Sequence, residues 1–66
     1  MDEIIKSWNE SHYPLTMEYE HRSYYKDGHD NDLYIIRVFD SNKIITKIKS
    51  GNSFLEAFDK IKGEPI

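Results

Sequence analysis

The 66-residue chain contains no cysteine and no long apolar segment. Without cysteine, neither disulfides nor thiolate-bound metal ions can stabilise the fold, and the composition fits a reducing compartment. The longest uninterrupted run of apolar and aromatic residues is 33–36, whereas a membrane-spanning helix needs about 20 such residues. The sequence therefore predicts a soluble, cytoplasmic protein that does not enter a membrane.

Basic residues are also scarce. Nine Lys and Arg stand against 12 Asp and Glu, which gives a net charge of −3. Direct nucleic-acid binding needs a basic surface that displaces counterions from phosphates, so we expect none. The imbalance is uneven, because residues 1–32 hold eight acidic and three basic side chains, and residues 33–66 hold four and six. This distribution favours a partner that is itself basic.

The length allows one domain, residues 1–66. A chain of this size buries only about 60% of the surface that its unfolded form exposes, so its core is small. Hydrophobic residues make up 38% of the chain and aromatic residues 14%, more than disordered chains contain. We expect a small folded domain that does not enclose a ligand cavity of about 300 Å³ or more.

The first expected element is a short amphipathic helix over residues 2–10. Ile4, Ile5 and Trp8 fall on one face of such a helix. Pro14 disfavours a helical conformation at the residue before it, so the helix should end before about residue 12.

Three segments have the composition and periodicity of strands: residues 15–25, 33–39 and 44–49. In the first, Leu15, Met17 and Tyr19 alternate with polar residues. The second is apolar at every position except Arg37, which predicts a central strand. Short connections between the three indicate an antiparallel meander.

The connections are polar. Residues 26–32 have the composition of a loop, and Asp27-Gly28 within them is a turn signal. Residues 40–43 form a tight turn, and the strand after it places Ile44, Thr46 and Ile48 on one side.

The last element is a helix over residues 53–62. Ser53 followed three residues later by Glu56 is a capping box, and Gly63 is suited to a left-handed cap before Pro65 stops the helix. The helix carries an apolar stripe of Phe54, Leu55, Phe58 and Ile61. The fold class is thus α+β: one α-β-β-β-α domain with a three-stranded antiparallel meander and both helices on one face.

The acidic segment that begins at Asp27 invites a test for a metal site. An EF-hand loop needs Gly at its sixth position and Glu at its twelfth, but counting from Asp27 these positions hold Asp32 and Val38. The three histidines show no i, i+4 pairing of the zinc-protease kind. We therefore expect a solvated turn, with no metal ion and no cofactor.

Catalytic chemistry has no support either. None of the serines has a nucleophile-elbow context, and Ser53 serves as a helix cap. Glu18 and Glu20 lie on the polar face of their strand, where they should remain ionised. The sequence predicts that the protein is not an enzyme.

A binding surface is better supported. Tyr13, Tyr24 and Tyr25 are hard to bury together, because adjacent strand residues face opposite sides of a sheet. An exposed tyrosine beside carboxylates is typical of a recognition surface, although a solvated hairpin end gives the same pattern. The predicted partner-binding residues are Glu18, Glu20, Tyr24, Tyr25, Asp27, Asp30 and Asp32.

Whether these side chains form one patch depends on strand order and loop conformation. In a meander, Glu18 and Glu20 should lie on one side of the polar face of the sheet, with Arg37 in the centre. Lys47 and Lys49 are expected on the opposite side of the same face. Some of these charges should then pair across strands.

The α-β-β-β-α order resembles that of the double-stranded RNA-binding domain. That resemblance implies a basic start to the final helix, but the helix here opens Ser53-Phe54-Leu55-Glu56. The order matches and the chemistry does not, which again argues against RNA binding.

A second resemblance rests on the stretch Leu33-Tyr34-Ile35-Ile36-Arg37-Val38, followed by a short polar turn, another strand and a capped Phe-rich helix. With the opening helix, this order resembles small acidic phage anti-CRISPR proteins that inhibit type II-A Cas9. The resemblance implies an inhibitor that occupies the DNA-binding surface of a host protein, and no individual binding residue is carried over.

The helix start Asn52-Ser53-Phe54-Leu55-Glu56-Ala57 also resembles antitoxin-like partner-binding domains.

The hypothesis that the sequence favours is a small, acidic, phage-type inhibitor and DNA mimic. It would bind a host protein that has a basic nucleic-acid-binding surface. The alternative is a structural or oligomerising module without such mimicry, and both fit a monomer or weak homodimer.

Overall fold

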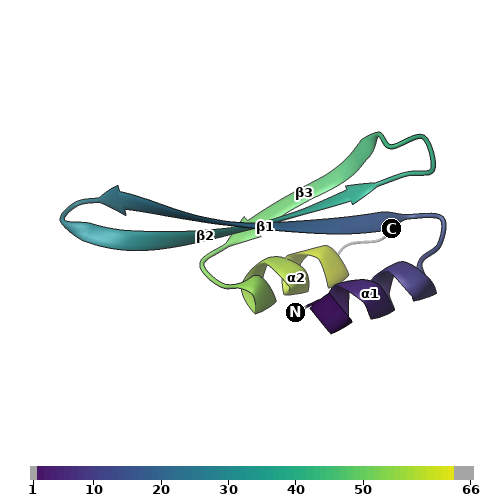
Figure 1. The fold of residues 1–66 in the computed structure, drawn as a ribbon, viewed down its shortest axis with the longest axis horizontal. Helices are drawn as coiled ribbons and strands as arrows, with labels where there is room; N and C mark the ends of the chain where they lie inside the picture. Colours follow the sequence, from purple (N-terminus) through teal and green to yellow (C-terminus); the bar gives the residue numbers. More distant parts are fainter. Residues whose placement is uncertain (1, 64–66) are drawn as a thin grey trace.

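A computed structural model describes residues 2–63 (Figure 1). Two helices flank three strands in the order α1 (Asp2–Ser11), β1 (Thr16–Lys26), β2 (His29–Phe39), β3 (Ile45–Gly51) and α2 (Phe54–Lys62). The sheet is an antiparallel meander with strand order β1-β2-β3, and both helices lie on one face of it. The predicted α+β fold is confirmed. Within residues 2–63, no helix has the length and apolar character needed to cross a membrane.

The core lies between the helices and the right-hand half of the sheet in Figure 1. Met17, Ile36 and Val38 face the helices, and Ile36 and Val38 are essentially inaccessible to solvent. Burying each such side chain stabilises the fold by about 1.5–3 kcal/mol relative to leaving it exposed. The helices contribute the remaining buried residues: Trp8, Phe54, Ala57 and Ile61.

At the start of α2, the predicted hydrogen bond to the Ser53 hydroxyl is present. The Glu56 N–H donates to Oγ of Ser53 at 3.1 Å, but the Glu56 carboxylate accepts from the N–H of Asn52 at 3.0 Å and not from that of Ser53. The prediction of a left-handed cap at Gly63 is wrong, because its φ of −73° continues the right-handed helical turn. Pro65 lies outside the described residues.

The expected loop over residues 26–32 is also wrong. Only Asp27 and Gly28 form the turn, with φ angles of 55° and 79°, and β2 already begins at His29. Positive φ at both central residues is typical of a type I′ turn, whose twist matches that of the flanking strands. The pairing therefore continues without interruption as far as Lys26 opposite His29.

The prediction for Lys47 and Lys49 of β3 is wrong as well, because they do not lie on the face of the sheet that carries Glu18 and Glu20. Lys47 pairs with Val38 and Lys49 with Ile36, so both lysines lie on the helix side of the sheet and not opposite Glu18 and Glu20. The apolar residues Ile45 and Ile48 consequently face away from the helices. Alternation of residues along a strand shows that it has two faces but does not show which face meets the helices.

Candidate partner-binding site

The β1–β2 hairpin projects beyond both helices at the left of Figure 1. We call residues 21–33 the hairpin arm. No residue of the arm is buried, although the molecule as a whole extends over 42 × 22 × 19 Å. The arm places the predicted site residues from position 24 onward on a bare two-stranded ribbon.

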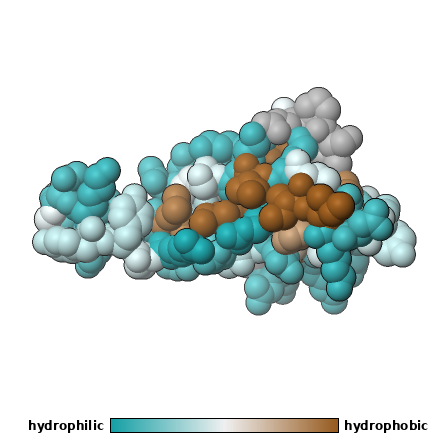
Figure 2. All heavy atoms as spheres, turned by 90° about the horizontal axis from the view of Figure 1, so that it is seen from above, coloured by the Kyte–Doolittle hydropathy of each residue, from teal (hydrophilic) through white to brown (hydrophobic). Residues whose placement is uncertain are grey.

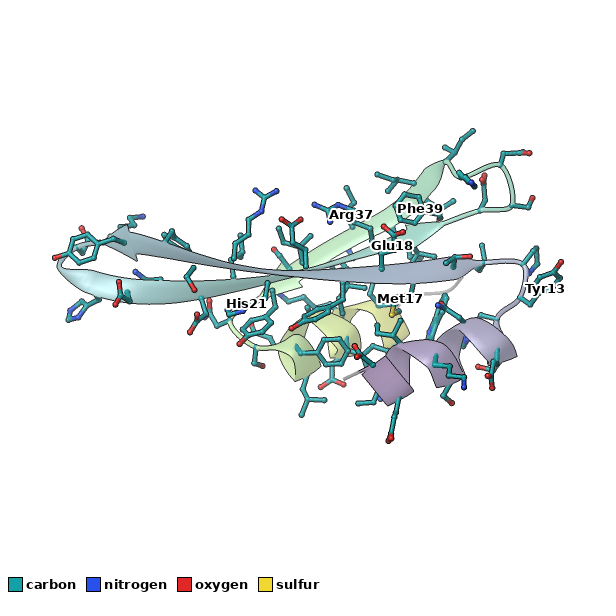
Figure 3. The ribbon with its side chains drawn as sticks, in the orientation of Figure 1. Tyr13, Met17, Glu18, His21, Arg37 and Phe39 are labelled. Atoms are coloured by element: carbon teal, nitrogen blue, oxygen red, sulfur yellow. The ribbon has the colours of Figure 1, made fainter. Side chains whose placement is uncertain are left out.

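The structure divides the predicted acidic set between two faces. In Figure 3, Met17 points toward the helices, while Glu18 and Arg37 point to the opposite side. Strand alternation puts Glu18, Glu20 and Tyr24 on this helix-free face. It puts Tyr25, Asp30 and Asp32 on the helix side, and Asp27 lies in the turn. The carboxylates therefore do not form one acidic patch.

On the helix-free face, Glu20 is held by two arginines. Nε of Arg22 donates to one carboxylate oxygen at 2.5 Å, and Arg37 donates to the other at 2.8 Å. Hydrogen bonds from Arg22 first and Arg37 second hold the pKa of Glu20 below its usual value. Glu20 is thus neutralised locally, whereas Glu18 forms no ion pair with any residue in 2–63.

On the helix side, Asp32 is the centre of a small polar cluster. Its Oδ1 accepts from Nε2 of His21 at 2.9 Å and from the Ser23 hydroxyl at 3.3 Å. These bonds, with that from His21 the stronger, lower the pKa of Asp32. The His21 ring also stacks on Tyr34, with centroids 4.4 Å apart.

The Ser-His-Asp composition of this cluster does not form a catalytic arrangement. A nucleophilic serine needs its hydroxyl beside a base, but the Ser23 hydroxyl donates to Asp32, as the His21 ring does. The sequence analysis did not predict this cluster. The signal for it was the Asp-Gly turn, which sets Ser23 opposite Asp32 with His21 two residues away on the same face.

Both tyrosines of the predicted partner-binding set are exposed. Tyr24 is 44% exposed and Tyr25 73% exposed, on opposite faces of the arm. Tyr19 and Tyr34 instead pack against the core, and the rings of Tyr19 and Phe54 are perpendicular, with centroids 5.1 Å apart. The arm therefore exposes one tyrosine on each of its two faces.

A second exposed feature is apolar and lies on the helix-free face of β2 and β3. Figure 2 shows apolar side chains running across this face. Ile45 and Ile48 are about half exposed, and Ile44 in the adjoining turn is 61% exposed. A hollow of about 290 Å³ lies beside them, lined by Thr16, Glu18, Phe39, Asp40 and Lys43. Sequence reasoning missed this surface because it placed Lys47 and Lys49, and not Ile45 and Ile48, on the face that carries Arg37.

Among residues 2–63, no group of three or more His, Asp or Glu side chains is arranged to hold a metal ion. A hollow of about 620 Å³ is open to solvent along α1 and is lined by Asp2, Ile5, Lys6, Asn9, Glu10 and Tyr13. Comparisons of the chain with protein-family models, with curated proteins and with solved structures find no match.

Proposed function

We propose that the protein is a small protein-binding inhibitor that contacts its partner through the hairpin arm. One observation carries the proposal: two tyrosines lie exposed on opposite faces of a projecting ribbon that no helix covers. Tyrosine is enriched at interface hot spots because its ring fills a pocket while its hydroxyl keeps a hydrogen bond. An arm of this kind reaches a recessed surface that a flat sheet does not reach.

The charge of the arm's tip supports a basic partner. Asp27 and Asp30 form no ion pair with any residue in 2–63, so their charges are available to steer association. Glu20 and Asp32 contribute less than the sequence suggested, because each is paired within the protein. The proposed contact set is therefore Tyr24, Tyr25, Asp27 and Asp30 in the arm, together with Glu18, which lies outside the arm on the helix-free face of β1.

The partner we propose is a cytoplasmic host protein that handles nucleic acid, such as Cas9, with its DNA-binding surface as the target. Two things support this choice: the resemblance to small phage inhibitors and the net negative charge of the chain. The proposal includes no catalytic step and no direct contact with nucleic acid.

The test is binding of the full chain to purified type II-A Cas9 at low and at high salt. Tyr25→Ala should weaken binding at both salt concentrations, by about 30-fold if Tyr25 is a hot spot. Asp30→Lys should weaken binding mainly at low salt, because screening removes steering by exposed charges. Asp59→Lys is the matched control: it makes the same charge change on the exposed side of α2.

The outcomes separate the two parts of the proposal. If Cas9 does not bind but a protein captured from host lysate responds to Tyr25→Ala and Asp30→Lys, the arm is right and the partner is wrong. If a captured partner binds both variants as it binds the wild type, the arm is not the binding site.

A second candidate function is an oligomerising module, as the antitoxin-like resemblance suggested. It is favoured by the position of β1, an 11-residue strand that lies at the edge of the sheet. An edge strand presents backbone groups that another strand can pair with.

A further inference from the structure

The two edges of the sheet differ in how far they are blocked. At the β3 edge, Nζ of Lys60 donates to the carbonyl oxygen of Ser50 at 2.7 Å, so α2 covers part of a strand of only seven residues. Lys47 and Lys49 also lie on β3, and lysines on an edge strand discourage pairing with another sheet. The β1 edge has no comparable lysine pair.

At the β1 edge, Asn9 shows which way the backbone groups point. Oδ1 of Asn9 accepts from the N–H of Met17 at 2.6 Å, and its Nδ2 donates to the Met17 carbonyl at 3.4 Å. Both backbone groups of Met17 therefore point away from β2. Asn9 covers this position much as a neighbouring strand would.

The direction of the backbone groups repeats every second residue along an antiparallel strand. Because the pairing of β1 with β2 is uninterrupted, the N–H and C=O groups that point outward after Met17 are those of Tyr19, His21, Ser23 and Tyr25. The two-residue turn agrees with this phase, since Lys26 and His29 flank it as an inward-bonded pair. Within residues 2–63, no side chain bonds these four outward positions.

We propose that β1 of a second copy of this chain pairs with this open edge. The two strands would run antiparallel about a twofold axis at His21 and join two sheets into one of six strands. The charges on β1 favour a second copy of the chain as the partner, and they also select the register of the pairing. With His21 opposite its own equivalent, Glu20 lies opposite Arg22 of the second copy, and the reverse pair forms as well.

Neighbouring registers are disfavoured by the same residues. Moving the axis by one residue places Glu20 opposite a second Glu20, or Arg22 opposite a second Arg22, and like charges directly opposite one another destabilise a sheet. In the favoured register, Glu20 lies between Arg37 of its own copy, which bonds it diagonally, and Arg22 of the second copy, so the charges alternate in sign. Each His21 keeps its own Asp32 on the other face.

Asn9 also limits how many residues of β1 can pair between the two copies. Because Met17 is already bonded, the shared ladder comprises the pairs of Tyr19 with Ser23, His21 with His21 and Ser23 with Tyr19. A ladder this short gives a weak dimer, so association is expected only toward millimolar concentration. This inference rests on the second candidate function and not on inhibition by the arm.

The central experiment uses sedimentation velocity of the full chain over micromolar to millimolar concentration. Wild type should form a dimer, and Glu20→Arg and Arg22→Glu should each weaken it by about tenfold or more. An equimolar mixture of these two variants should dimerise again, because each opposite pair then carries complementary charges. Association by each variant alone at the wild-type level, or no heterodimer in the mixture, would overturn the register.

A backbone substitution tests the edge itself. Ser23→Pro removes an N–H that points outward, so it should abolish the dimer while leaving the hairpin folded. Ser23→Ala keeps that N–H and should dimerise like wild type. Amide exchange should agree: the amides of Tyr19, His21 and Ser23 become protected as concentration rises, whereas that of Arg22 is protected throughout.

A strict monomer at every concentration, or a dimer that Ser23→Pro leaves intact, would overturn edge pairing. Neither result bears on partner capture by the arm, because Tyr25→Ala and Asp30→Lys test that function at concentrations where the chain is monomeric.

Discussion

The two halves of the β1–β2 ribbon share one register but are stabilised differently. In the half that packs against the helices, Met17, Ile36 and Val38 are buried against α1 and α2. In the arm, residues 21–33, nothing is buried, and order comes from the turn, from backbone pairing and from contacts such as His21 on Tyr34. The comparison suggests a division of roles: one half holds the fold together, and the other is available for contact.

The contrast also explains how the arm keeps its register. In a sheet with a buried face, a one-residue slip would expose the apolar set, so burial fixes the register. The arm has no buried face of its own. Its register is inherited from the packed half and fixed at the far end by the type I′ turn at Asp27 and Gly28.

The largest expected difference between the halves is in core truncation. Ile36→Ala should lower the free energy of unfolding by about 2–5 kcal/mol, because Ile36 is fully buried. Tyr24→Ala in the arm should change it by only about 0.5 kcal/mol or less. Urea unfolding followed by Trp8 fluorescence measures both, with Ile36→Val as a milder variant should Ile36→Ala not fold. Similar losses for the two truncations would show that the arm belongs to the packed core.

Two glycines give a smaller contrast. A Cβ at Gly51 would lie 2.9 Å from Cγ of Glu56 and 3.0 Å from the backbone N of Ala57, so Gly51→Ala should cost about 1–3 kcal/mol. A Cβ at Gly28 would meet the Tyr25 hydroxyl at an ordinary contact distance of 4.0 Å, but the φ of 79° is unfavourable for other residues, so Gly28→Ala should cost about 1 kcal/mol.

The two glycine variants should also differ in where the damage appears. Gly51→Ala should accelerate amide exchange in β3 and α2, and Gly28→Ala should accelerate it within the arm. Exchange that changes equally across the molecule in both variants would contradict separate stabilisation of the two halves.

The packed half was largely predictable from the sequence. Met17 and Tyr19 alternate with polar residues, and Phe54 and Ile61 recur along α2, because one face of each element packs in the core. Leu55, which the predicted stripe included, is instead 60% exposed. The Ser53 cap is a local signal and was confirmed. A helix or strand produces a periodic pattern of apolar residues in the sequence when one of its faces is buried.

The arm was not predictable in the same way. Asp30, Asn31 and Asp32 have loop composition because neither face of this ribbon is buried, yet they form β2 through the register that the turn sets. The pairing of Glu20 with Arg22 and Arg37, and of His21 with Asp32, depends on this register too. The predicted site residues were therefore brought onto one hairpin but not onto one face.

The smallest expected effect is a difference in response to acid. The pKa of Asp32 is lowered in the folded protein, first by its hydrogen bond from His21 and then by that from Ser23. A carboxylate whose folded pKa lies below its unfolded pKa stabilises the fold above the unfolded value, and that stabilisation is lost as pH falls through the folded value. Asp32→Asn should therefore flatten the loss of stability between about pH 5 and pH 2.

Glu20 provides the comparison at the junction of the two halves. Its pKa is lowered by Arg22 and Arg37, and Arg37 is three-quarters buried. Glu20→Gln should therefore flatten the acid dependence of global unfolding, because the bond to Arg37 ties β1 to the packed part of β2. Asp32→Asn should act mainly on amide exchange within the arm, since its partners His21 and Ser23 both lie there. If Asp32→Asn changed global unfolding at low pH as much as Glu20→Gln does, the arm and the packed half would unfold as one unit.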